Sequence, residues 1–299
     1  MPSVSNNNCI IQHHNSPHHK SYYVGYVNNQ YDWDRLLDLM MDSLVDFVYG
    51  FHKSALNPED ATYTLKKALQ KLSNTEERLK NTGEVGELLL HIILRKFFHT
   101  TPLLQKMYLK TNRNDPVKGI DIVHAIEQDN NLNIIFGEAK LYKNPSQAIA
   151  DLLEDVKSHY NNDFMTDEFI TIGDNPVETN LLSQDLGDKY KALYSKLDLI
   201  SRTFLEQPNV PHKINEFFNG VSIVLFCAFK SDVFEKYKDM TDEFVTEMEN
   251  KLNKLFEQYD KVKPTSNGDI IFVLFPLLDH DILINKFLTK LREADNGQL

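Results

Sequence analysis

Apolar side chains spaced three and four residues apart mark the helices of this chain, because that spacing places them on one helix face. In the N-terminal part the spacing predicts a helix over Trp33–Phe51 and a second that begins at Asn57-Pro58-Glu59-Asp60 and runs towards Leu79. The second start has a capping Asn, a Pro in the first turn and acids on the helix dipole. Later helices are expected at Gly83–Phe98, Pro145–Tyr160, Asp188–Phe204, Thr241–Tyr259 and Asp281–Arg292.

Short apolar runs bounded by polar or turn residues indicate strands. They predict strands at Tyr22–Val27, Leu104–Lys110, Ile120–Ile126, Leu132–Ala139, Gly220–Phe229 and Asp269–Pro276. The last two runs are apolar almost throughout, which is typical of strands buried on both faces of an α/β sheet. The sequence Asp129-Asn130-Asn131 predicts the turn that joins the third and fourth strands as a hairpin.

From Gly83 onward the predicted order is helix, three strands, helix, strand, helix, strand, helix. This order favours an α/β core over residues 83–299, in which a mixed sheet is flanked by helices. Residues 1–82 are expected to hold a polar tail and a helical region. The tail, residues 1–20, is rich in Asn and His and is predicted to be poorly ordered. Histidines can bind metal ions, but no acid or cysteine completes a site around those of the tail, which are His13, His14, His18 and His19.

The composition is that of an ordinary soluble chain. With 299 residues, 41% of them hydrophobic, the chain can bury a sizeable core. No apolar run approaches the ~20 residues of a membrane-spanning helix, and the N-terminus lacks the pattern of a signal peptide. Two cysteines, Cys9 and Cys227, are too few for a disulfide framework or a four-cysteine zinc site. We expect a cytoplasmic protein.

The net charge of −11 excludes the class of proteins that are basic throughout, such as histone-like proteins. It is compatible with a nucleic-acid enzyme, because the local field at a site matters more than the total charge. Between Leu88 and Gln147 the bases outnumber the acids by three. The acidic stretches Asp151–Asp155 and Asp239–Glu249 are expected to be solvated helix faces.

The predicted hairpin carries the candidate chemistry, since its strands are apolar except at Asp121, Glu138 and Lys140. Alternation along a strand places Glu138 and Lys140 on one face, and the turn puts Asp121 roughly opposite Glu138. Buried carboxylates are costly unless they are paired or bind a metal ion. One interpretation is an ion pair at the rim of the sheet. The other is a Mg²⁺ (or Mn²⁺) site with oxygen ligands from Asp121, Glu138 and the Ala139 carbonyl. In that site Lys140 would orient and activate the attacking water.

The helix before the hairpin adds two acids. Glu84 follows Asn81 by three residues, which fits a capping box. Glu87 lies on a helix that is apolar nearly all round, so we expect it to be buried rather than solvated. It either completes a metal shell or pairs with His91 or a nearby base.

A helix Glu, a strand Asp, a Glu-x-Lys on the next strand and a following helix together resemble the PD-(D/E)xK nuclease superfamily, whose core has the order αβββαβ. The matching residues are Glu87, Asp121, Glu138 and Lys140. The Pro that usually precedes the Asp is absent, and Gly119-Ile120 stand in its place.

More narrowly, three segments look like the HamA family, the nuclease subunits of Hachiman anti-phage defence systems. They are Gly83–Leu90, Lys118–His124 and Gly137–Lys140, and the likeness covers about Gly83–Tyr160. The resemblance implies a Mg²⁺-dependent DNA nuclease that works with a large helicase partner, HamB, and is released on phage infection.

Residues beside the site have weaker signals. Similar nucleases often place a Gln near the site where Gln147 stands, although a solvated Gln is an equal alternative. Lys118, Lys143 and Arg113 lie on loops where they could contact phosphates or be ordinary surface bases. His124 has the wrong strand parity to face a metal with Asp121, so a packed or surface histidine is expected.

A second function class also fits part of the pattern. The chain could be a non-catalytic nuclease-fold module that binds DNA or assembles with a partner. The intact Asp121, Glu138 and Lys140 argue against it, because such a module needs none of the three.

Overall fold

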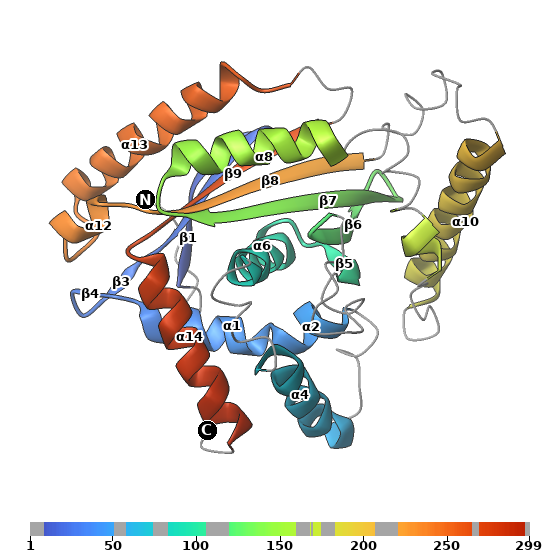
Figure 1. Ribbon diagram of the computed structural model, residues 1–299, viewed down its shortest axis with the longest axis horizontal. Coiled ribbons are helices and arrows are strands. Elements are labelled where there is room, and N and C mark those ends of the chain that lie inside the picture. The colour runs from blue at the N-terminus through green and yellow to red at the C-terminus, as the bar shows by residue number, and fades with distance from the viewer. Residues whose placement is uncertain are drawn as a thin grey trace.

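The computed structural model describes residues 9–50, 58–73, 83–105, 120–159, 168, 170–174, 183–206, 221–264 and 269–296. Its centre is a seven-stranded mixed sheet with the order β1-β2-β9-β8-β7-β6-β5 (Figure 1). The strands of this sheet are β1 (Ile10–Asn15), β2 (His19–Val24), β5 (Thr101–Gln105), β6 (Ile122–Gln128), β7 (Asn131–Tyr142), β8 (Val221–Lys230) and β9 (Asp269–Leu277). The neighbours β2, β9, β8 and β7 run parallel, and the outer pairs are antiparallel.

Helices flank both faces of this sheet. They are α1 (Trp33–Asp42), α2 (Leu44–Tyr49), α4 (Pro58–Ser73), α6 (Glu84–Phe97), α8 (Pro145–His159), α10 (Gln184–Glu206), α12 (Val233–Lys236), α13 (Asp242–Asp260) and α14 (His280–Asp295). In Figure 1, α8 and α13 lie on one side of the sheet, and α6 lies on the other with α1, α2, α4 and α14. None of the helices within the described residues is long and apolar enough to cross a membrane.

The N-terminal tail is where the fold departs most from expectation. Residues 10–15 form β1 and residues 19–24 form β2, where the prediction had a poorly ordered segment up to residue 20, and β2 pairs in parallel with β9. The predicted strand Tyr22–Val27 is confirmed in part, since its first three residues belong to β2 and its last two form β3 (Tyr26–Val27). Tyr22, Tyr23 and Val24 are completely buried. A composition rich in Asn and His concealed these strands, because their stability comes from long-range pairing and burial. Beyond them, β3 and β4 (Gln30–Tyr31) form a small separate hairpin.

The first predicted helix, Trp33–Phe51, is interrupted at Ser43, which ends α1 and precedes α2. The Ser43 hydroxyl donates a hydrogen bond of 2.8 Å to the Leu39 carbonyl, one turn earlier. Such a bond competes with the helix ladder and bends helices. The predicted division between residues 82 and 83 falls in a segment outside the described residues, and both parts contribute strands to one sheet.

The predicted strand hairpin is confirmed. Asp129 and Asn130 form its turn with positive φ angles of 51° and 62°, as a type I′ turn requires. The first of the three predicted strands begins at Thr101, three residues before the predicted start at Leu104. Its described part ends at Gln105, and residues 106–119 lie outside the described residues. Gly137 lets α6 approach β7 closely, since a Cβ there would lie 2.8 Å from Leu90 Cδ2.

Candidate functional site

Asp121 lies across from Glu138 where the β6–β7 ladder ends. The last paired residues are Ile122 and Gly137, which places Asp121 and Glu138 at the next position of the register. Beyond this point β7 continues to Tyr142 along β8. The Ala139 N–H donates a hydrogen bond of 3.0 Å to Asp121 Oδ2. The Asp121 side chain thus accepts the Ala139 N–H, which a backbone carbonyl of a longer β6 would otherwise accept.

Glu138 and Lys140 point to the face of β7 that carries α8 and α10. Ala139 and Leu141, which alternate with them, lie against α6, since a Cβ on Gly86 would meet both. Lys140 Nζ lies 2.5 Å from Asp155 Oδ2 on α8. On the same face, Phe136 belongs to the apolar cluster beneath α10. Glu138, only 2% exposed, therefore lies between the parts of β7 that α10 and α8 cover.

The Lys140 ammonium interacts with three carboxylates. Burial alone would lower the pKa of Lys140, but the hydrogen bond and charge of Asp155, together with the charges of Asp121 and Glu138, raise it above its usual value. Lys140 is therefore protonated at neutral pH. The hairpin charges predicted to converge do act on one another.

Both acids of α6 are buried. Glu84 is 1% and Glu87 6% exposed, which confirms that Glu87 is not a surface acid. The predicted capping box is wrong, because α6 begins at Glu84 with Gly83 as its cap, in a left-handed conformation with φ 76°. Gly86 packs against Ala139 and Leu141, so the first turn of α6 lies at the level of the hairpin acids. It approaches β7 from the face opposite Glu138.

The donor set suits a hard divalent cation in charge and in atom type. Three carboxylates act on the protonated Lys140, the buried ones of Asp121 and Glu138 and the half-buried one of Asp155. Two more buried carboxylates, those of Glu84 and Glu87, lie on α6 at the opposite face of β7. Carboxylate oxygens are the ligands that Mg²⁺ prefers, and an excess of buried negative charge favours a cation. These oxygens are not gathered tightly. Among the described residues, three ligand atoms within 4.8 Å of one another occur instead at Asp279, His280 and Asp281.

That second group is an ion-pair cluster. Lys230 Nζ lies 3.1 Å from Asp279 Oδ2, and Lys143 Nζ lies 2.9 Å from Asp281 Oδ2. Asp279 Oδ1 also accepts the Ile282 N–H and caps α14. Two lysines and a helix N-terminus already balance these two carboxylates.

Two of the residues predicted to assist the hairpin site, Lys143 and Gln147, contact other side chains instead. Lys143, proposed for phosphates, pairs with Asp281. Gln147 is exposed and donates a hydrogen bond of 2.6 Å to Asp151 Oδ1. Lys118 and Arg113 lie outside the described residues.

Asp155 is the residue that sequence reasoning missed. Its stretch was expected to be solvated, but its side chain is 26% exposed and pairs with Lys140. The available signal was the spacing of Gln147, Asp151 and Asp155, which places three polar side chains along one face of α8. The other acidic stretch is solvated as expected, with Phe244 and Met248 turned inward.

A buried histidine pair lies on the α6 side of the hairpin, and His124 is packed as predicted. His91 Nδ1 lies 3.2 Å from His124 Nε2, and Thr100 Oγ1 lies 2.7 Å from His124 Nδ1. Arg95 donates to Asp46 Oδ2 at 2.8 Å beside them. Burial lowers the pKa of His91 to about 4, against the opposing charge of Asp46 and with the help of Arg95. Burial, then the charges of His91 and Arg95, lower the pKa of His124.

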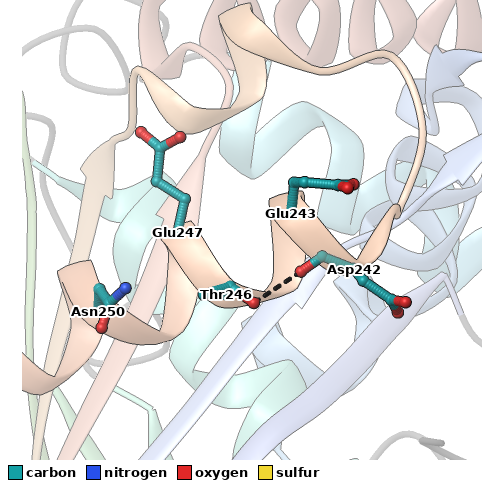
Figure 2. A pocket seen from close by; sticks show the side chains of 5 residues that line it. All are labelled: Asp242, Glu243, Thr246, Glu247 and Asn250. Atoms are coloured by element: carbon teal, nitrogen blue, oxygen red, sulfur yellow. Dashed lines mark hydrogen bonds between the residues drawn. The ribbon is translucent and has the colours of Figure 1, made fainter.

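A pocket of about 400 Å³ lies on α13 (Figure 2). It is lined by Asp242, Glu243, Thr246, Glu247 and Asn250. Its three carboxylates would repel a phosphate, and none of the predicted site residues lines it. The pocket does not fit the substrate that the hairpin suggests.

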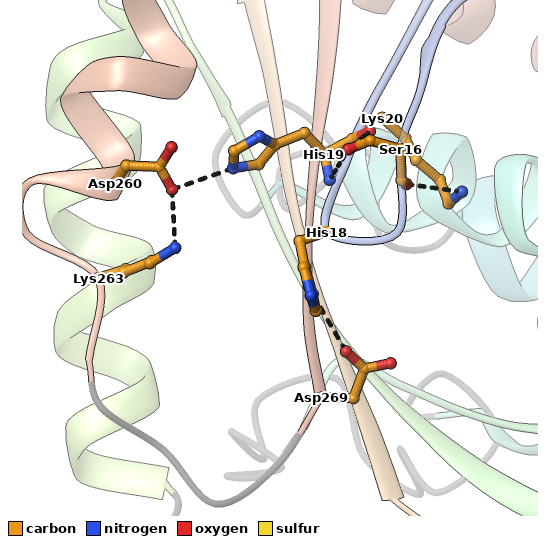
Figure 3. A network of polar contacts seen from close by, with 7 residues as sticks. All are labelled: Ser16, His18, His19, Lys20, Asp260, Lys263 and Asp269. Atoms are coloured by element: carbon orange, nitrogen blue, oxygen red, sulfur yellow. Dashed lines mark hydrogen bonds and ion pairs between the residues drawn. The ribbon is translucent and has the colours of Figure 1, made fainter.

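Two histidines of the predicted tail contact acids of the C-terminal part of the chain (Figure 3). His18 Nδ1 lies 3.3 Å from Asp269 Oδ1, and His19 Nε2 lies 3.1 Å from Asp260 Oδ1. His19 also stacks on Phe256. The prediction of a loose histidine-rich tail is therefore wrong for residues 9–20, because strand pairing and contacts with acids far along the chain order them. Residues 1–8 of that tail lie outside the described residues.

Comparison with protein families matches residues 3–291 to the HamA family. The chain belongs to the HamA family. It is therefore a protein of a Hachiman defence system. The match covers β1 and β2 as well as the hairpin, so the HamA unit includes the N-terminal strands. A search of curated proteins finds none that matches this chain.

Proposed function

We propose that this HamA-family protein is a Mg²⁺-dependent nuclease that hydrolyses phosphodiester bonds in DNA. The observation that carries the proposal is the placement of Asp121 across from Glu138, with Lys140 on the same face of β7. The order α6, β5, β6, β7, α8, β8, with β8 parallel to β7, also matches the αβββαβ core of PD-(D/E)xK nucleases.

The chain's own residues would divide the work as follows. Asp121 and Glu138 would hold the cation, with the buried Glu87 as the candidate from α6. A bound Mg²⁺ supplies charge that polarises a phosphoryl oxygen and stabilises the leaving oxyanion. Lys140, which is protonated, would balance charge on the phosphate and orient the attacking water. The hydrogen bond from Ala139 would keep the Asp121 carboxylate in place.

The proposal of control by a partner rests on membership of the HamA family and not on the geometry of the hairpin site. We propose that a HamB-type helicase holds the nuclease in check and releases it on infection. The acidic surface of α13 would repel DNA, so we expect DNA to approach from the hairpin side.

Cleavage of plasmid and linear DNA by the purified chain tests the proposal, with Mg²⁺ and with EDTA. We expect cutting in Mg²⁺ only and its loss in Glu138→Ala. Glu127→Ala is the matched control, since Glu127 lies on the same hairpin but pairs with Lys189 at the surface. Equal cutting by wild type and Glu138→Ala would contradict the proposed site. DNA binding without Mg²⁺ and without cutting, alone and with the helicase, would favour the non-catalytic module.

A further inference from the structure

We propose that Asp155 on α8 is a positioning residue of the hairpin site, which holds the Lys140 ammonium away from the metal-binding oxygens of Asp121 and Glu138. The inference rests on the proposed function. The contact that carries it is the 2.5 Å approach of Lys140 Nζ to Asp155 Oδ2, between β7 and α8.

This pair differs from an ordinary surface salt bridge. Both side chains are about a quarter exposed, and Asp155 Oδ2 itself is shielded from solvent. Both belong to packed elements: α8 is anchored by buried Leu152 and Val156 on either side of Asp155, and β7 pairs along its length with β8. A shielded pair between two packed elements is screened less by salt than an exposed one.

Three carboxylates compete for the Lys140 ammonium. The charges of Asp155, Asp121 and Glu138 all act on its ammonium, and Asp155 makes the contact. A lysine has a flexible four-carbon stem and a compact charge. Without the Asp155 carboxylate, the ammonium would therefore move onto the nearest remaining oxygens, which are those of the hairpin acids.

That movement would matter because the ammonium and a divalent cation compete for the same oxygens. Mg²⁺ needs deprotonated, accessible carboxylate oxygens. An ammonium held at Asp155 does not occupy these oxygens and still lies on the face of β7 where a phosphate would arrive. Asp155 thus acts on metal binding through Lys140 and does not itself touch the metal or the substrate.

The test is a double-mutant cycle on Mn²⁺ affinity, measured by calorimetry on the full chain without DNA. We expect Asp155→Asn to weaken Mn²⁺ binding about tenfold when Lys140 is present, and by less than about threefold in a Lys140→Met background. Asp155→Glu should restore most of the affinity. Glu154→Gln is the matched control, because it removes the same charge from an exposed neighbouring position that pairs with Lys157. This variant should bind Mn²⁺ as wild type does.

The outcomes separate the inference from the proposed function. Equal weakening by Asp155→Asn in both backgrounds would overturn the inference, since it would show a long-range charge effect that does not pass through Lys140. Unchanged affinity in Asp155→Asn would also overturn it. A wild type that binds Mn²⁺ with the expected coupling but never cuts DNA would refute the proposed function and leave the role of Asp155 intact. If Asp155→Asn does not fold by circular dichroism, Asp155→Ala takes its place in the cycle.

Discussion

The Asp121 carboxylate has two separate roles, which different substitutions at this position can distinguish. One oxygen accepts the buried N–H of Ala139, and its negative charge contributes to the proposed cation site. The first role concerns stability, because a buried donor left without an acceptor costs roughly 1–3 kcal/mol. The second concerns charge and needs an ionised group.

We predict that Asp121→Asn retains the stability of wild type within about 1 kcal/mol, because the amide oxygen can still accept the Ala139 N–H. The same variant should lose DNA cleavage, since an amide carries no charge. Asp121→Ala should lose cleavage and also about 1–3 kcal/mol of unfolding free energy, because the Ala139 N–H then has no acceptor. Urea unfolding and cleavage assays on both variants check this. An Asp121→Asn protein that cleaves normally would show that the charge is not needed.

At the scale of elements, the His91–His124 contact joins α6 to β6 on the face opposite Glu138. Two ring nitrogens 3.2 Å apart cannot both carry a proton, so burial and this contact favour the neutral forms. The pKa of His91 is about 4 in the folded chain, against roughly 6.5 in an unfolded one.

These depressed pKa values set a pH dependence of stability. Between about pH 6.5 and 4 the unfolded chain binds protons that the folded chain does not, so the unfolding free energy falls as the pH falls, by up to about 1.4 kcal/mol per pH unit for each histidine. The contribution is complete above about pH 6.5. We predict that urea unfolding from pH 7.5 to 4.5 shows this fall in wild type and a shallower one in His91→Gln. A slope unaltered by the substitution would mean that His91 is already protonated in the folded chain.

How far the sequence predicts an element depends on whether its signal is local. The hairpin was predictable because a two-residue period and an Asp129-Asn130 turn act over a few residues, and these place Asp121 opposite Glu138. Strand β1 and the first half of β2 were not, because β2 depends on pairing with β9 some 250 residues away. Asp155 was missed for the same reason: its role depends on how α8 crosses β7.

At the scale of the whole molecule, one sheet joins the N-terminal strands to the hairpin that bears the acids. The parallel strands β2, β9, β8 and β7 lie between β1 and β6, and α6 and α8 cover β7 from opposite faces. The acids behind the net charge of −11 lie in two different environments. The acids that act on Lys140 are buried or half-buried, while those of α13 are solvated.

The central claim is that the open end of the β6–β7 hairpin binds a divalent cation. Diffraction at the manganese absorption edge from a crystal soaked in Mn²⁺ tests it most directly, because the anomalous signal locates the ion. We predict a peak between the carboxylates of Asp121 and Glu138 in wild type, absent from Glu138→Ala. A peak only at Asp279, His280 and Asp281, where three ligand atoms already lie within 4.8 Å, would contradict the account, as would no bound Mn²⁺.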